Sequence, residues 1–273
     1  MKKFIALILA VVVFATLGLT ACKSGDDSST TAPSSTAPSE QGSSTVSVKT
    51  VKEGVLTMAT NAEFPPYEYY EGDTIVGIDA EVAALIAEKL GLELEIADID
   101  FNAIVPGVQT GKYDMGMAGM TVSEDRLKNV NFTTSYAKGI QVVIVKTDSG
   151  IASVDDLAGK KIGVQEATTG DIYASEDFGD ENVVKYANGA LAVEGLKSGK
   201  VDCVIIDNEP AKAYVAANEG LKILETTYAD EDYAICVSKE NDELKEAIDN
   251  ALKELIADGS LQKIVDKYIP ADN

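Results

Sequence analysis

The sequence predicts an α/β protein with mostly parallel sheets over residues 51–268. Apolar runs of strand character alternate there with segments in which apolar residues recur at helical spacing. The composition is that of a globular protein, with 45% hydrophobic and 25% charged residues, so neither wholesale disorder nor a multi-span membrane protein fits. Sheets of this class bind ligands in a crevice at the carboxyl ends of their strands, so the strand-end loops are where a site is expected.

The expected strands and helices alternate along the chain. Expected strands are residues 55–59, 92–96, 114–119, 141–146, 161–164 and 201–207. Expected helices are residues 79–90, 188–197, 210–217, 242–257 and 260–268. In the first helix, Asp79 can cap the start and Gly91 the end.

The residue counts exclude whole classes of function. The chain contains no histidine, which excludes Ser-His-Asp and Cys-His catalysis and every His-ligated metal site. A formal charge of −22 argues against nucleic-acid binding, because a phosphate backbone repels such a surface. Neither a phosphate-binding glycine loop nor a carboxylate pattern typical of catalysis or calcium binding is found. We therefore expect no cofactor, no metal ion and no catalytic residue.

The first 50 residues have the character of a processing signal and a tether. Basic Lys2 and Lys3 precede an apolar stretch that is short for a membrane anchor, which predicts a cleaved signal peptide over residues 1–21. The four residues that end at Cys22 resemble a bacterial lipobox, in which the cysteine thiol becomes lipidated; the alternative is a plain signal peptide with a chance cysteine. Residues 22–50 would then be a lipidated cysteine and a Ser/Thr-rich disordered tether.

Arg126 is the only arginine in the chain. It follows the strand expected at 114–119 and a short turn, where free backbone N–H groups are available. One interpretation is bidentate pairing with a carboxylate or phosphate, which the planar guanidinium does and lysine does not. The other is a surface salt bridge with Glu124 or Asp125.

Asp207 ends the strongly apolar strand expected at 201–207. A carboxylate in that position is either an N-cap of the following helix or a partner for a cation, and local reasoning favours the cap. The loop 165–170 also follows a strand and opens a helix, so its N–H groups form a weak candidate for an anion site.

Two loop aromatics and two cysteines each leave two interpretations open. Phe64 and Phe101 are either lids of the core or platforms for a ligand. Cys203 and Cys236 lie in apolar strand-like runs, and buried free thiols are favoured over a disulfide.

Taken together, these loops resemble the solute-binding proteins of polar amino-acid ABC transporters, the bacterial extracellular solute-binding proteins of family 3. The resemblance covers nearly all of residues 51–268. The segments that carry it are 59–68, 76–79, 101–106, 109–111, 118–121, 164–170 and 201–207, together with Ser123, Arg126 and Phe132. Each segment is a weak match alone, and the ordered set is specific.

The resemblance implies the type II periplasmic-binding-protein fold: two Rossmann-like α/β lobes with a ligand cleft between them. Lobe 1 would comprise residues 51–138 and 234–273, and lobe 2 residues 139–233. The implied ligand-binding residues are Asn61, Glu63, Phe64, Phe101, Ala118, Gly119, Thr121, Arg126, Gln165, Thr168, Thr169 and Asp207.

The resemblance also implies a role for several of these residues, and a zwitterionic ligand would need one charged partner on each lobe. Arg126 would bind the α-carboxylate with Thr121 and the N–H of Thr169, while Asp207 and the carbonyl of Gly119 would bind the α-ammonium. Phe64 and Phe101 would sandwich the side chain, which Glu63, Gln165 and Glu166 would help to select. Two positions depart from the family pattern: Ala167 stands where glycine is common, and Asn61 where several members have aspartate.

The implied function is that of the extracytoplasmic binding component of an ABC importer, which captures a polar L-amino acid and delivers it to the permease. The expected protein is a monomer on the bacterial cell surface, lipid-anchored to the membrane. It would bind no nucleic acid and would not be an enzyme. Two alternatives belong to other classes: a cleft enzyme of the cyclohexadienyl-dehydratase type, which would need a positioned acid or base, and a ligand-sensing receptor domain.

Overall fold

The computed structural model describes residues 48–225 and 227–270, all within the compact unit formed by residues 44–273. The expected signal peptide, Cys22 and most of the expected tether lie outside these residues. Residues 48–50, also expected in the tether, belong to the folded part. Val48 is buried in the core, and the carbonyl of Lys49 accepts a hydrogen bond from Asn241 Nδ2 at 2.9 Å.

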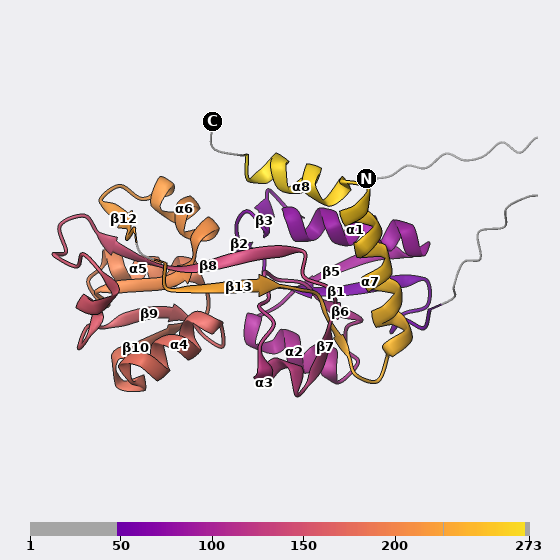
Figure 1. Ribbon diagram of the computed structural model, residues 1–273, viewed down its shortest axis with the longest axis horizontal. Helices are drawn as coiled ribbons and strands as arrows, with labels where there is room; N and C mark the ends of the chain where they lie inside the picture. The colour runs from indigo at the N-terminus through magenta and orange to yellow at the C-terminus, as the bar shows by residue number, and fades with distance from the viewer. Residues whose placement is uncertain (1–47, 226, 271–273) are drawn as a thin grey trace, which may run out of the picture. The chain divides into compact units, whose positions relative to one another are not determined.

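The first sheet has the strand order β5-β1-β6-β14-β7 (Figure 1). Strands β5, β1 and β6 are parallel, and β14 is antiparallel to both β6 and β7. The bounds are β1 Val55–Thr60, β5 Glu93–Asp98, β6 Met115–Gly116, β7 Val130–Phe132 and β14 Cys236–Ser238. The chain segment that follows β1 forms a small antiparallel sheet, with β2 Glu63–Phe64, β3 Glu68–Glu71 and β4 Thr74–Val76.

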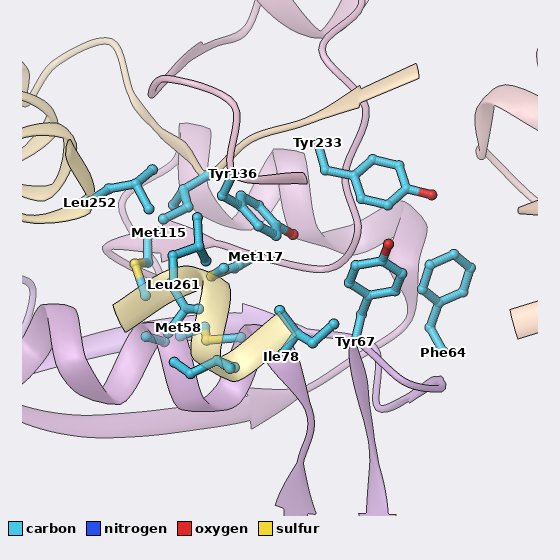
Figure 2. Close-up of a cluster of buried hydrophobic side chains, with 14 of the residues drawn as sticks. Met58, Phe64, Tyr67, Ile78, Met115, Met117, Tyr136, Tyr233, Leu252 and Leu261 are labelled. Carbon is cyan, nitrogen blue, oxygen red and sulfur yellow. The ribbon is translucent and has the colours of Figure 1, made fainter. Parts of the chain in front are cut away.

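Helices cover both faces of the first sheet (Figure 1). On one face α1 packs against α7 and α8 over a core that includes Met58, Met115 and Leu252 (Figure 2). On the other face α2 packs through Ile104 and Val108. The bounds are α1 Ile78–Leu90, α2 Phe101–Gln109, α3 Glu124–Leu127, α7 Asp242–Ala257 and α8 Ser260–Tyr268. We call this sheet with its helices lobe 1.

The second sheet has the order β10-β9-β11-β8-β12, with β13 also paired to β8. Strands β10, β9 and β11 are parallel, and β8 is antiparallel to its neighbours. The bounds are β8 Ala137–Lys146, β9 Ile162–Gln165, β10 Val183–Tyr186, β11 Cys203–Asp207, β12 Leu221–Ile223 and β13 Ala229–Tyr233. The helices are α4 Thr169–Phe178, α5 Gly189–Lys197 and α6 Asn208–Ala217, with short 3₁₀ turns at Val154–Leu157 and Asp180–Asn182.

Alternate residues of β8 show how this sheet is buried on two sides. Val142 and Ile144 belong to the core beneath α5 and α6, whereas Val143 and Val145 belong to the core beneath α4. This is the period-two pattern of a strand covered on both faces. We call this sheet with its helices lobe 2.

Strands β8 and β13 connect the two lobes (Figure 1). They pair antiparallel from Ala137↔Tyr233 to Gln141↔Ala229, and Tyr233 also forms a bridge with Thr121 of lobe 1. The expected lobe boundaries at 138/139 and 233/234 fall on these two strands. Two hydrogen-bonded strands form a hinge about which lobes can move.

Three local expectations need correction. The helix N-cap of α1 is Gly77, and Asp79 is buried instead of capping. The strand expected at 114–119 is confined to Met115–Gly116, because Gly119 takes a φ of 51° and its N–H binds Asp79 Oδ2 at 2.9 Å. Asp207 occupies the N-cap position of α6, as local reasoning expected, but its side chain makes no capping bond.

Cys203 and Cys236 are buried free thiols, as expected. Burial raises the pKa of both thiols to about 12. They lie in β11 of lobe 2 and β14 of lobe 1. Within the described part of the chain, no helix combines the length and the apolar character that membrane crossing requires.

Candidate functional site

A cavity of about 20 Å³ lies where loops of both lobes meet. Its lining residues are Asn61, Phe64, Glu68, Phe101, Ala118, Gly119, Thr121, Arg126, Thr168, Thr169 and Asp207. Ten of these are among the twelve expected site residues. The elements explain the convergence, because the loops follow parallel strands β1, β5, β6, β9 and β11, whose carboxyl ends face one edge of each sheet.

The two other expected residues lie beside the cavity. Gln165 is buried, and its Nε2 donates to Asn61 Oδ1 at 2.9 Å, which links the lobes. Glu63 is exposed, and its carbonyl accepts from the Tyr214 hydroxyl at 2.8 Å. Glu166, the third residue expected to select the side chain, accepts from Asn102 Nδ2 at 3.3 Å.

Arg126 defines one end of the cavity. Its side chain is buried, with Nη1 donating to the carbonyl of Thr121 at 2.8 Å and Nη2 to the carbonyl of Ala167 at 3.1 Å. The guanidinium lies over the ring of Phe101, 5.2 Å from its centroid. No ion pair joins Arg126 to a carboxylate within residues 48–225 and 227–270, and Asp125 pairs with Lys128 instead. The surface salt-bridge interpretation is therefore wrong.

Ala167 completes this end of the cavity with an unusual backbone conformation. Its φ is 63°, a left-handed value that costs an L-residue roughly 1–2 kcal/mol. Asp171 of α4 accepts the N–H of Ala167 at 3.0 Å, and Arg126 binds its carbonyl. The geometry explains why glycine suits this position, which the sequence marked only as a departure from the family pattern.

Asp207 lines the cavity from lobe 2, and we call its surroundings the Asp207 end. It is buried at the end of β11, where Oδ2 accepts from Gln141 Nε2 at 2.8 Å and Oδ1 accepts from the Tyr233 hydroxyl. Tyr233 can reach it because Gly139 has no side chain: a Cβ there would lie 2.2 Å from the Tyr233 hydroxyl oxygen. The pKa of Asp207 lies well above its ordinary value, first because of burial and second because of the nearby charge of Glu231.

Three aromatic rings at the edge of the lobe 1 core lie near this end of the cavity. Figure 2 shows Phe64, Tyr67 and Tyr233 side by side at the edge of the core cluster. Tyr67 meets Tyr233 edge to face at 5.2 Å between ring centroids and lies 5.8 Å from Phe64. Phe64 is itself buried and lines the cavity, which is compatible with a core lid and with a ligand platform.

A second acidic pair lies behind the Gly119 loop. Asp79 Oδ2 accepts from the Tyr136 hydroxyl at 2.8 Å as well as from Gly119 N. Glu68, which lines the cavity, is buried close enough to Asp79 for the charge of Asp79 to raise the pKa of Glu68 further. Burial is the larger effect on both groups, and it raises the pKa of Asp79 to about 6.

Sequence reasoning missed four residues that hold the site together: Glu68, Asp79 as a buried acid, Gln141 and Glu231. Gln141 had a readable signal, because it is a polar residue inside the apolar run 140–145. Glu231 had none, since it lies in an acidic stretch that reads as solvated surface. Among the described residues, no group of three or more Cys, Asp or Glu side chains could hold a metal ion.

Comparison with known proteins gives consistent matches. Residues 56–271 match the profile of "Bacterial extracellular solute-binding proteins, family 3". The arginine-binding extracellular protein ArtP of Bacillus subtilis is 31% identical over 277 aligned positions that cover 100% of both chains. The arginine-, lysine-, histidine-binding protein ArtJ of Geobacillus stearothermophilus has a TM-score of 0.76 at 33% identity, over 80% of this chain and 96% of that one. An ancestral arginine-binding protein bound to glutamine has a TM-score of 0.75 at 40% identity, over 80% and 99%.

Proposed function

The chain belongs to family 3 of the bacterial extracellular solute-binding proteins, and we propose that it captures L-arginine for an ABC importer. It is the extracytoplasmic amino-acid-binding component of that system. The observation that carries the proposal is that Arg126 of lobe 1 and Asp207 of lobe 2, both buried, line the same cavity. An α-amino acid carries a fixed negative and a fixed positive charge, which these two side chains match.

At the Arg126 end, the guanidinium binds the ligand α-carboxylate. Two of its five N–H donors go to the carbonyls of Thr121 and Ala167, which fix its plane and leave donors for a forked bond. The N–H of Thr169, in the first turn of α4, adds a donor at a helix N-terminus. At the Asp207 end, the carboxylate and the carbonyl of Gly119 bind the α-ammonium.

Ligand binding favours lobe closure because the two charges are held by different lobes. Arg126 belongs to lobe 1, and Asp207 to lobe 2. Bonds already cross between the lobes, from Arg126 to Ala167 and from Gln165 to Asn61. A cavity of about 20 Å³ has room for about one water molecule, so an amino acid enters only when the lobes move apart. A ligand that touches both lobes stabilises the closed state.

The surplus of acid around the cavity supports a basic ligand. Glu68 and Asp207 line it and Glu231 lies next to Asp207, whereas Arg126 supplies the basic group. The relatives ArtP and ArtJ are named for binding arginine, or arginine, lysine and histidine. A second candidate is glutamine, supported by the amides of Asn61 and Gln165 beside the cavity and by the glutamine-bound relative.

In the cell the protein acts as a monomer, returns its ligand unchanged and delivers it to permease subunits. It is held at the membrane by lipid on Cys22, so Cys22→Ala should release the protein into the wash fraction. Cys22→Ala protein that stays membrane-bound would contradict the anchor. Chemical conversion of arginine during incubation with the protein, detected by chromatography, would favour the enzyme alternative.

A melting screen against the twenty amino acids tests the ligand. A ligand at 100 times its Kd adds about 2.7 kcal/mol to the free energy of unfolding if it binds only the folded state. We expect the largest rise in melting temperature with L-arginine, followed by compaction in small-angle scattering. A larger rise with glutamine would favour the second candidate, and no rise with any amino acid would reject the proposal.

A further inference from the structure

Two buried carboxyl groups meet at one amide beside the cavity. Gln141 Nε2 lies 2.8 Å from Asp207 Oδ2 and 3.0 Å from Glu231 Oε2, so its two hydrogens serve both acids. Asp207 is 7% exposed and Glu231 5%. The three residues come from different strands, β8, β11 and β13, which the hinge brings together. The pair is therefore a product of the tertiary structure.

The hydrogen bonds around the pair link both ends of the cavity. Glu231 Oε2 also accepts from the hydroxyl of Thr121 at 3.0 Å, next to the carbonyl that Arg126 binds. Glu231 Oε1 is buried and has no hydrogen-bond partner among the described residues. Two carboxylates in one buried site repel each other, and the lowest-energy arrangement keeps one proton between them.

We propose that the pair of Asp207 and Glu231 holds one proton, on Asp207, in the unliganded protein and that the ligand α-ammonium displaces it. This inference rests on the proposed function. The proton leaves a carboxyl O–H for a buffer base in the solvent, and the ammonium then faces the ionised Asp207. Glu231 is a positioning residue: it acts on the ligand through Asp207, and its charge sets the pH range in which Asp207 ionises.

Other groups face the pair from each neighbouring element and modify its titration. The Tyr233 hydroxyl donates to Asp207 and lowers the pKa of that carboxyl, whereas Glu231 raises it. The charge of Arg126 lies close enough to both acids for them to raise its own pKa against the lowering effect of burial. The further titratable groups that face the pair are Tyr67, Glu68 and Tyr173.

The sign of the pH dependence follows from the proton count. The unliganded site binds one proton more than the liganded site, so a fall in pH favours the unliganded form. Below the pKa of the free pair, affinity falls about tenfold for each pH unit, and above it affinity is constant. An ordinary aspartate, already ionised at pH 5, would give no such slope over pH 5–8.5.

The experiment is calorimetric titration of L-arginine into the full-length protein at several values between pH 5 and 8.5. Each titration is run in two buffers that differ in ionisation enthalpy, which counts the protons released. Wild type should release close to one proton per arginine at the acidic end and lose affinity there about tenfold per pH unit. If arginine binds with constant affinity and without proton exchange, the proton inference is wrong and the proposed function stands. If arginine does not bind at pH 8.5, both the inference and the proposed function are wrong.

Two isosteric variants identify the source of the proton. Glu231→Gln keeps oxygen and nitrogen atoms for Thr121 and Asp207 but removes the charge, so proton release should disappear and the affinity slope should flatten. Asp202→Asn is the control, because it removes an exposed acid just before the opposite end of β11, where Asp202 Oδ2 accepts from Lys161 N at 2.8 Å. It should release as much as wild type. Release that persists in Glu231→Gln, or that disappears equally in Asp202→Asn, overturns the assignment, and the wild-type proton count decides even if a variant fails to fold.

Discussion

The Arg126 and Asp207 ends of the cavity hold their charges in opposite ways. Arg126 makes its contacts with neutral groups, two backbone carbonyls and the face of Phe101, and Glu231 and Asp207 act on it through their charges. Asp207 is buried against a second acid, Glu231, and is stabilised by the donors of Gln141 and Tyr233. Guanidinium stays protonated at all relevant pH values, whereas a carboxyl group beside another does not stay ionised. One end is therefore permanently charged, and the other acquires its charge when the ligand arrives.

The largest effect is expected at the permanently charged end. Arg126→Lys keeps the charge but loses the planar fork that spans the carbonyls of Thr121 and Ala167. Arginine affinity should fall by about 2–5 kcal/mol, some 30- to several-thousand-fold, measured by calorimetry. Lys128→Gln is the control, because Lys128 is exposed and pairs with Asp125 next to this residue. An Arg126→Lys affinity equal to that of Lys128→Gln would contradict the role of the fork.

Asp207→Asn tests the other end with a smaller expected loss. Asparagine keeps one acceptor oxygen for the ammonium but not the charge, so affinity should fall by about 2–3 kcal/mol, or roughly 30- to 150-fold. The control is Asp202→Asn, just before the opposite end of β11, where Asp202 Oδ2 accepts from Lys161 N at 2.8 Å. Unchanged arginine binding by Asp207→Asn, with Asp202→Asn also unchanged, would remove Asp207 from the ligand site.

Tyr233→Phe tests how Asp207 is held, because it removes the hydroxyl that donates to this carboxyl group. The hydroxyl lowers the pKa of Asp207, so its loss makes the carboxyl harder to ionise. At pH 7 the arginine affinity should fall about tenfold, because a hydrogen bond to a charged group contributes about 1.5 kcal/mol at the lower end of its range. The affinity profile should also move to higher pH, the reverse of the shift expected for Glu231→Gln. A profile that stays in place would show that the hydroxyl does not govern this carboxyl.

Ala167→Gly is expected to have the smallest effect, at the Arg126 end. Glycine relieves the left-handed φ of 63°, although it also gives the unfolded chain more freedom. The net gain in the free energy of unfolding should be about 0.5–1 kcal/mol in urea titrations. Ala158→Gly, at an exposed position with a φ of −56°, should instead be slightly destabilising. Equal effects of the two substitutions would mean that Ala167 is not strained.

From the sequence we could predict the fold class and eleven of the described helices and strands, and the family resemblance added ten of the eleven residues that line the cavity. Helices α7 and α8 begin and end where the apolar spacing places them, because each buries one continuous face. The loops after β1, β5, β6, β9 and β11 could be predicted to converge, since parallel strands send their carboxyl ends to one edge. The lone arginine in such a loop was a local signal that needed no knowledge of the structure.

Which carboxyl groups share a site depends on contacts between residues that lie far apart in the sequence. Asp207 alone fits a helix cap, and the choice against the cap comes from Gln141 and Tyr233, which lie 66 and 26 residues away in the chain. Glu231 is one acid in an acidic stretch until the pairing of β8 with β13 buries it beside Gln141. From its sequence position Asp79 fits a helix cap. In the structure its carboxylate instead accepts hydrogen bonds from Gly119 N and the Tyr136 hydroxyl, 40 and 57 residues away in the chain. Burial and the distance between two charges set the pKa of a carboxyl group, and neither quantity is encoded in its sequence neighbours.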